Sequence, residues 1–91
     1  MTYTSSSNKL VIHDYKTGDT MYVNYAYTNT SCGTVGSACA PSSYGTIRRS
    51  TTGIGSETYY LTPGSYTYVL LQLCNDDAPP DTCSNWKRSA A

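Results

Sequence analysis

His13 and Asp14 are the residues that come closest to a catalytic pair, because the chain has one histidine and an acid follows it directly. In a Ser/His/Asp site the histidine contacts both an acid and a nucleophile, beside an oxyanion hole. Adjacent residues of a strand point to opposite faces, so His13 and Asp14 do not pair with each other. The chain also lacks a Gly-x-Ser-x-Gly elbow. We therefore predict a non-enzymatic protein, with His13 at the surface or at a strand end.

Acidic residues near the C-terminus are the next candidates, because carboxylates are calcium ligands. Asp76, Asp77 and Asp81 lack the spaced Asp-x-Asp-x-Asp pattern of a calcium loop, and Pro79-Pro80 stiffens the segment between them. We predict a solvated hairpin tip there, with no metal and no other cofactor.

Two further motifs favour ordinary surface roles. Arg48 and Arg49 would point to opposite faces of a strand, so at most one joins any patch, and we predict solvated edge charges. The segment Gly53-Ile54-Gly55 is not a phosphate loop, because neither Lys-Ser/Thr nor a helix follows it.

Four cysteines are spaced as Cys32-x6-Cys39 and Cys74-x8-Cys83, unlike the short Cys-x2-4-Cys pairs of zinc sites. Three disulfide pairings are open. We favour the local one, 32–39 with 74–83, because each pair flanks a turn-rich segment. Chain entropy gives each short loop about 2.5 kcal/mol. Disulfides imply an extracellular or virion-surface location, although the chain opens Met1-Thr2-Tyr3 without a secretion signal.

The composition excludes some partners. The net charge is zero and 13% of the residues are charged, which argues against nucleic-acid binding. No apolar stretch is long enough for membrane insertion. The chain has ten tyrosines and no phenylalanine. Tyrosine-rich surfaces are typical of binding loops, and tyrosine also simply suits strands.

The pattern of apolar residues predicts one all-β domain over 9–91, preceded by a polar arm or frayed edge strand over 1–8. We expect about six or seven short strands in an antiparallel β-sandwich with disulfide-stapled loops. Within 20–28, alternation places Met21, Val23, Tyr25 and Tyr27 toward the core. The expected strands are 9–15, 20–28, 44–50, 56–61, 66–73 and 84–91.

A Pro-Gly turn separates the last two long strands. The residues Leu61-x-Pro63-Gly64-x-Tyr66 resemble the "tyrosine corner" of fibronectin type III domains, with one spacer residue fewer. The resemblance extends through Cys74-Asn75 and Cys83-Ser84-x-Trp86. It implies an immunoglobulin-like sandwich, with the Tyr66 hydroxyl bonded to upstream backbone. The turn itself predicts type II geometry, with Gly64 at the second central position.

Strand 66–73 is apolar on both faces. One sandwich core cannot bury both, so we expect one face to meet a helix, a neighbouring subunit or a folded-over arm, unless a β-bulge rotates the strand. The candidate interface residues are Val69, Leu71, Leu73, Tyr3, Tyr22 and Trp86.

Two functions follow from these expectations. The first is a structural subunit that packs against protein subunits of the same or a companion type. A phage capsid-decorating (cement) protein, or another virion or filament surface protein, would fit. The alternative is a glycan- or protein-binding adhesion module of a secreted or cell-surface bacterial protein. It would recognise its ligand through the loops 32–39 and 74–83, and exposed Tyr and Trp near the loop tips would suit sugar stacking.

Overall fold

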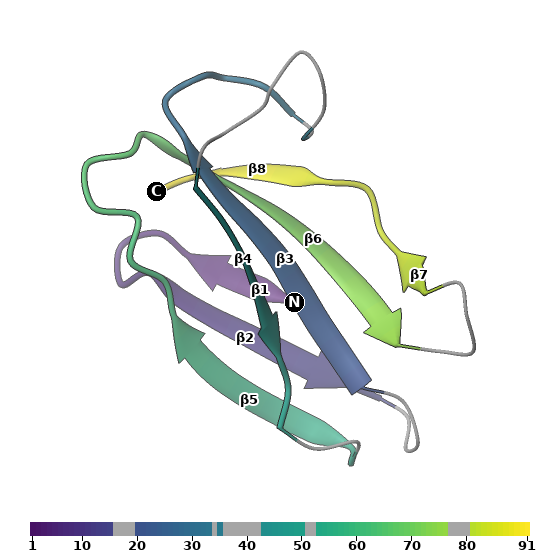
Figure 1. The fold of residues 1–91 in the computed structure, drawn as a ribbon. Helices are drawn as coiled ribbons and strands as arrows, with labels where there is room; N and C mark the ends of the chain where they lie inside the picture. The colour runs from purple at the N-terminus through teal and green to yellow at the C-terminus, as the bar shows by residue number, and fades with distance from the viewer. Residues whose placement is uncertain (16–19, 34, 36–42, 51–52, 77–80) are drawn as a thin grey trace.

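The chain forms two antiparallel β-sheets that pack against each other (Figure 1). The computed structural model describes residues 1–15, 20–33, 35, 43–50, 53–76 and 81–91, and these contain no helix. The all-β prediction is therefore confirmed. The strands are β1 (Thr2–Thr4), β2 (Lys9–Asp14), β3 (Thr20–Thr28), β4 (Ser43–Arg48), β5 (Gly55–Tyr60), β6 (Tyr68–Asp76), β7 (Thr82–Cys83) and β8 (Lys87–Ala90).

The smaller sheet has the strand order β1-β2-β5, and the larger sheet has the order β4-β3-β6. Both β7 and β8 pair with β6 on its far side. The chain changes sheets between β2 and β3, between β4 and β5, and again between β5 and β6. Strands β4 and β5 each have one partner strand in the described part of the chain, so each is an edge.

The main core lies between the two sheets and follows the two-residue period of the strands. Alternate residues of β2, β3 and β6 point inward and bury their side chains. The inward set predicted for 20–28 is confirmed, because Val23 and Tyr27 are buried while Met21 and Tyr25 pack against the core. The buried members of this core are Leu10, Ile12, Val23, Tyr27, Leu61, Val69 and Leu71.

A glycine makes room for one of these inward tyrosines. Gly45 lies directly opposite Tyr25 in the β3–β4 ladder. A Cβ atom at Gly45 would collide with the phenol ring of Tyr25, so the close packing of β4 against that ring depends on glycine.

Of the two alternatives for residues 1–8, the structure shows the edge strand, because Thr2–Thr4 form β1 of the smaller sheet. β1 pairs antiparallel with β2, with Thr2 opposite Val11 and Thr4 opposite Lys9. Asn8 ends the connecting turn with a left-handed φ of 55°. Its side chain accepts a hydrogen bond from the Tyr3 hydroxyl at 3.1 Å, and its carbonyl accepts one from the Leu61 amide at 2.9 Å.

The C-terminal part also differs from expectation. β6 continues through Asn75 and Asp76, because both residues pair with β3, so the hairpin tip begins later than predicted. Of the expected final strand 84–91, only Lys87–Ala90 (β8) is a strand, and the short strand β7 precedes it at Thr82–Cys83. With β1 added, the described residues form eight strands rather than six or seven.

Candidate functional site

The corner after β5 has the predicted composition but a different turn. Leu61 and Pro63 are buried, and Gly64 has a positive φ of 57°. The amide of Tyr66 donates to the carbonyl of Pro63 at 3.0 Å, which makes Gly64 the first central residue of the turn and not the second. A positive φ at the first position alone is the type II′ pattern, so the type II prediction is wrong.

The tyrosine that bonds this corner is Tyr27, not Tyr66. The amide of Thr62 donates a hydrogen bond to the Tyr27 hydroxyl at 2.9 Å. The ring of Tyr66 lies beside that of Tyr27, with centroids 5.9 Å apart. Among the described residues, the Tyr66 hydroxyl has no hydrogen-bond partner. The hydrogen bond to the corner backbone that was predicted for Tyr66 is therefore made by Tyr27, a core residue of β3.

The three β6 residues assigned to an interface belong to the interior. Val69 and Leu71 are 0% and 3% exposed in the main core. Leu73 is partly buried and packs against the same core. These side chains point between the two sheets, as the inward residues of β3 do in the neighbouring strand. The candidate-interface assignment of Val69, Leu71 and Leu73 is therefore corrected.

The opposite face of β6 is apolar because other parts of the same chain cover it. Leu70 is fully buried and forms a second, smaller cluster with Ala26. β6 pairs with β3 in unbroken register from Tyr68 to Asp76, so no bulge rotates this strand. The expectation that a helix, arm or neighbouring subunit must cover this face is wrong. The cover is formed by Cys32, Val35 and Trp86.

The remaining candidate interface residues have intramolecular partners. Tyr3 packs against the main core and Trp86 against the smaller cluster. Tyr22 is buried, and its hydroxyl donates a hydrogen bond to the Asp81 carboxylate at 2.5 Å. That hydrogen bond, with desolvation, raises the pKa of Tyr22. The guanidinium of Arg48 lies 4.6 Å from the centre of the Tyr22 ring. These residues therefore do not form one free surface.

The predicted Cys74–Cys83 disulfide is present and joins directly opposed residues of β6 and β7. Cys74 is buried while Cys83 is exposed. None of the described cysteines is a free thiol. Cys39 lies outside the described residues, so the pairing of Cys32 with Cys39 stays a prediction, and so does the tip around Asp77 and Pro79-Pro80.

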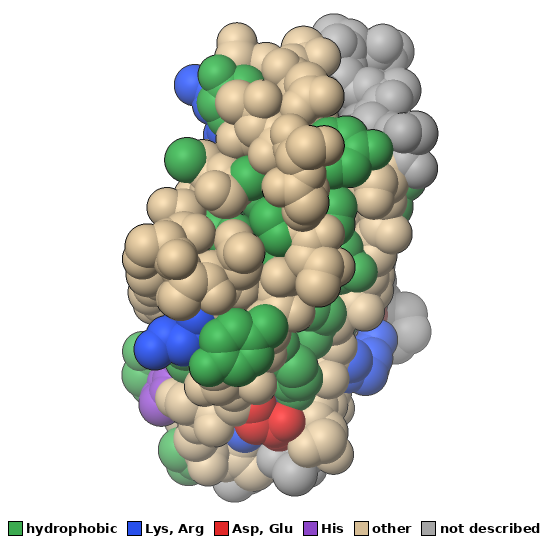
Figure 2. Space-filling model, turned by 90° about the vertical axis from the view of Figure 1, so that its left-hand side faces the viewer, with side chains coloured by type: hydrophobic (Ala, Val, Ile, Leu, Met, Phe, Trp, Pro, Cys, Tyr) green, Lys and Arg blue, Asp and Glu red, His purple; other side chains and the backbone are tan. Residues whose placement is uncertain are grey.

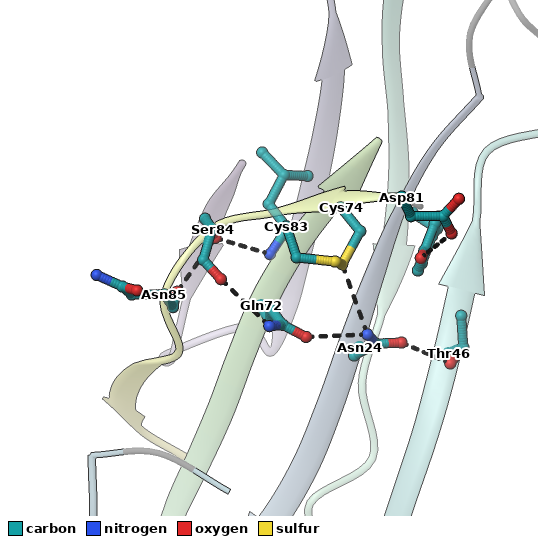
Figure 3. The surroundings of a disulfide bond; sticks show 10 residues. Asn24, Thr46, Gln72, Cys74, Asp81, Cys83, Ser84 and Asn85 are labelled. Carbon is teal, nitrogen blue, oxygen red and sulfur yellow. Dashed lines mark hydrogen bonds between the residues drawn. A yellow bond between two sulfur atoms is a disulfide. The ribbon is translucent and has the colours of Figure 1, made fainter. Parts of the chain in front are cut away.

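A line of polar side chains crosses the outer face of the larger sheet next to this disulfide (Figure 3). We call it the polar strip. The Thr46 hydroxyl donates to Asn24 Oδ1 at 2.8 Å, and Asn24 Nδ2 donates to Gln72 Oε1 at 3.1 Å. Gln72 Nε2 then donates to the carbonyl of Ser84 at 3.2 Å. Every donor points the same way, from β4 toward the segment after β7.

A second feature is a small pocket of about 180 Å³ where β2 and β6 end and β3 begins. The ring of His13 lies 4.2 Å from that of Tyr15, and His13 Nδ1 is hydrogen-bonded to the Ser56 hydroxyl. The adjacent Asp14 is buried, and its Oδ2 atom lies 3.4 Å from Arg49 Nη1. The pocket is lined by His13, Asp14, Tyr15, Met21 and Asn75.

Arg49 is paired with Asp14 of this pocket in a buried ion-pair cluster, which corrects its assignment as a solvated edge charge. Its Nη1 atom is 3.4 Å from Asp14 Oδ2, and both side chains are almost fully buried. Its Nε atom is 3.6 Å from Glu57 Oε1. Arg48 remains exposed and pairs with Asp76 at 2.7 Å. The side chains of the two adjacent arginines therefore point to opposite faces, as the strand geometry predicts.

Hydrogen bonds to the Glu57 carboxylate shift two pKa values, that of Glu57 itself and that of Tyr59. The Tyr59 hydroxyl donates to Glu57 Oε2 at 2.7 Å. This bond, and hydrogen bonds from Ser50, lower the pKa of Glu57. Burial, together with the same tyrosine–glutamate bond, raises the pKa of Tyr59 to about 12. The cluster thus keeps Glu57 ionised and Tyr59 neutral over a wide pH range.

Comparisons with known proteins identify no relative, because no family model, no curated protein and no solved structure matches this chain. The described residues contain no group of three side chains suited to hold a metal ion. In the same part of the chain, no helix is long and apolar enough to cross a membrane.

The sequence reasoning missed the polar strip and the buried arginine. A signal for the strip was present, because Asn24 lies between Tyr22 and Ala26 on its strand face, and Gln72 lies between Leu70 and Cys74 on its own. No comparable signal marks Arg49, since Asp14 is far from it in sequence and both Asp14 and Glu57 meet it only through the fold.

Proposed function

We propose that this protein is a non-enzymatic structural subunit that packs against further copies of itself in a larger assembly, such as the surface of a virion or filament. The support comes from the open side of the sandwich and not from the β6 residues that the sequence indicated. On that side the edge strands β4 and β5 approach each other, because the Tyr59 hydroxyl donates to the Arg48 carbonyl at 3.3 Å.

The observation that carries the proposal is the apolar surface between these two edges. Seen from the side on which β5 and the corner segment lie, hydrophobic side chains form a band down the molecule (Figure 2). Residues of β3, β4, β5 and the corner are only partly buried and pack against the core; they include Tyr25, Ile47, Tyr59 and Tyr66. Such a band beside unpaired backbone groups favours an added strand.

Two different edges on one side have a consequence for assembly. β4 and β5 are each six residues long. Pairing of β4 in one copy with β5 in the next would be a heterologous contact, which continues into a chain of subunits unless the rotation closes a ring. That property suits a repeating surface better than a simple dimer.

The strand order also supports a relationship to immunoglobulin-like sandwiches. The orders β1-β2-β5 and β4-β3-β6-β7/β8 correspond to A-B-E and C′-C-F-G. This is part of the same proposal, since fold alone does not define a function.

Sedimentation over a range of protein concentrations tests the proposal. We expect self-association from the micromolar to the millimolar range, with slowed amide exchange in β4 and β5. Thr58→Lys places a charge on the exposed face of the β5 edge and should abolish the association. Thr2→Lys, an exposed residue of β1, is the matched control. A monomer at every concentration, or equal loss in both variants, would contradict the proposal.

A further inference from the structure

We propose that the outer face of the larger sheet binds a neutral oligosaccharide at the polar strip, with Tyr44 as the stacking platform for a sugar ring. This site lies on a different surface from the open side between β4 and β5. It requires neither self-association nor the assembly proposed above.

The first support is the arrangement of the strip between aromatic side chains. Tyr44 and Thr46 lie two residues apart on the same face of β4, and Tyr44 is 56% exposed. Across the sheet, Trp86 packs on Leu70, next to the row that holds Gln72. A flat aromatic face with an adjacent line of polar groups matches the two kinds of surface on a pyranose, its C–H face and its hydroxyl edge.

The second support is the hydrogen-bonding capacity that the strip retains. The Thr46 hydroxyl donates to Asn24 and keeps its lone pairs. Gln72 Nε2 uses one N–H on the Ser84 carbonyl, and within the described residues its second N–H has no partner. The strip therefore offers both an acceptor and a donor, and sugar hydroxyls can complement both. Because its members already bond one another, they are held in place before a ligand arrives.

The third support is the balance of charge around the strip, which favours a neutral ligand. The strip itself has no ionised side chain. Arg48 is paired with Asp76 at 2.7 Å. On the other flank, Arg88 donates to the carbonyl of Ser31 at 2.7 Å and lies 5.3 Å from the centre of the Tyr68 ring. Both arginines are therefore engaged in contacts within the chain.

NMR titration of the whole chain tests the site, with cellohexaose, maltoheptaose, xylohexaose and chitohexaose as separate probes. We expect at least one probe to give saturable shifts of the side-chain amide signals of Asn24 and Gln72. Tyr44→Ala should weaken that binding by about tenfold or more. Tyr60→Ala is the matched control, since Tyr60 is 66% exposed on the smaller sheet. Its affinity should equal that of the unchanged protein.

Three outcomes would overturn the inference. The first is the absence of saturable shifts with every probe up to about 10 mM, beyond which binding is too weak to be specific. The second is equal weakening by Tyr44→Ala and Tyr60→Ala. The third is amide shifts that follow protein concentration and not sugar concentration, which would assign this face to a second copy. Thr58→Lys separates the two proposals, because it should abolish self-association and leave sugar binding unchanged.

Discussion

The hydroxyl of Tyr27 accepts a hydrogen bond from the backbone amide of Thr62 at 2.9 Å, and this bond ties β3 of the larger sheet to the corner that follows the smaller one. The acceptor side chain is buried and Thr62 is exposed, so the bond is part-buried. The sequence predicts such a hydrogen bond to the corner backbone for Tyr66, three residues beyond Pro63, and Tyr27 makes it instead.

Tyr27→Phe should therefore destabilise the fold. The substitution keeps the ring but leaves the Thr62 amide without its acceptor, and a lost hydrogen bond of this kind costs about 1 kcal/mol. Urea denaturation measures the change. Tyr66→Phe is the control and should change stability by less than about 0.5 kcal/mol. A larger loss of stability in Tyr66→Phe than in Tyr27→Phe would instead support Tyr66 as the residue that bonds the corner.

Leu71→Ala should act on the fold and not on an interface. Leu71 is 3% exposed in the main core, and removing such a side chain costs about 2–5 kcal/mol. The melting temperature should fall at every protein concentration alike. An unchanged melting temperature together with altered sedimentation would contradict the core position of Leu71 and indicate that it lies at an interface.

Arg49→Met should be among the most damaging single changes at a charged residue. It removes the cation beside the buried Asp14 carboxylate, and breaking a buried ion pair costs about 3–5 kcal/mol. The double variant Arg49→Met/Asp14→Asn should recover part of that loss, because the negative charge is removed as well. Denaturation of both variants gives the comparison. Arg48→Met, which affects an exposed pair, should cost less than about 1 kcal/mol. Equal effects of Arg48→Met and Arg49→Met would contradict the burial of Arg49.

Stability should decline as the pH rises from about 10 to about 12 through the ionisation of Tyr59. Its pKa is raised from 10.0 to about 12 in the folded protein. A group with a raised folded-state pKa contributes stability that is complete below pH 10 and is lost up to the folded value. The slope from this single proton is at most about 1.4 kcal/mol per pH unit. Chemical denaturation at several pH values measures it.

Tyr59→Phe removes the ionising group and should flatten that part of the pH profile. Tyr60→Phe, one residue further along β5 and exposed, leaves it unchanged. A profile of equal steepness in the Tyr59→Phe variant would show that other tyrosines cause the decline.

Local patterns were sufficient to predict most of the strands and the Cys74–Cys83 bond. Alternation in 20–28 placed Val23 and Tyr27 correctly, because a strand has one inward residue in every two. The same rule failed for β6, where both faces are apolar, because it cannot tell which loop will fold over the second face. For residues 1–8 the sequence left a polar arm and an edge strand open, since β1 is polar and its order comes from the ladder of Thr2–Thr4 with β2.

The candidate sites were harder to predict than the strands. The polar strip joins residues of β3, β4 and β6 through register, and register was not available from single strands. Arg49 was misplaced for a similar reason: a charged side chain is normally solvated, and only the fold brings two acids to it. Tyr27 and Tyr66 could not be distinguished by residue type, because the turn geometry decides which hydroxyl reaches the backbone.

The Cys74–Cys83 bond also determines how the molecule would respond to a pulling force. The bond joins neighbouring strands across a sequence separation of nine, so residues 75–82 lie inside a covalent loop. When the chain is stretched from its two ends, these eight residues never come under tension. At about 3.5 Å per extended residue, the contour length released on unfolding is shorter by roughly 28 Å until the disulfide is reduced. A subunit on the surface of a particle would thus keep this tip closed even when its sheets are pulled apart.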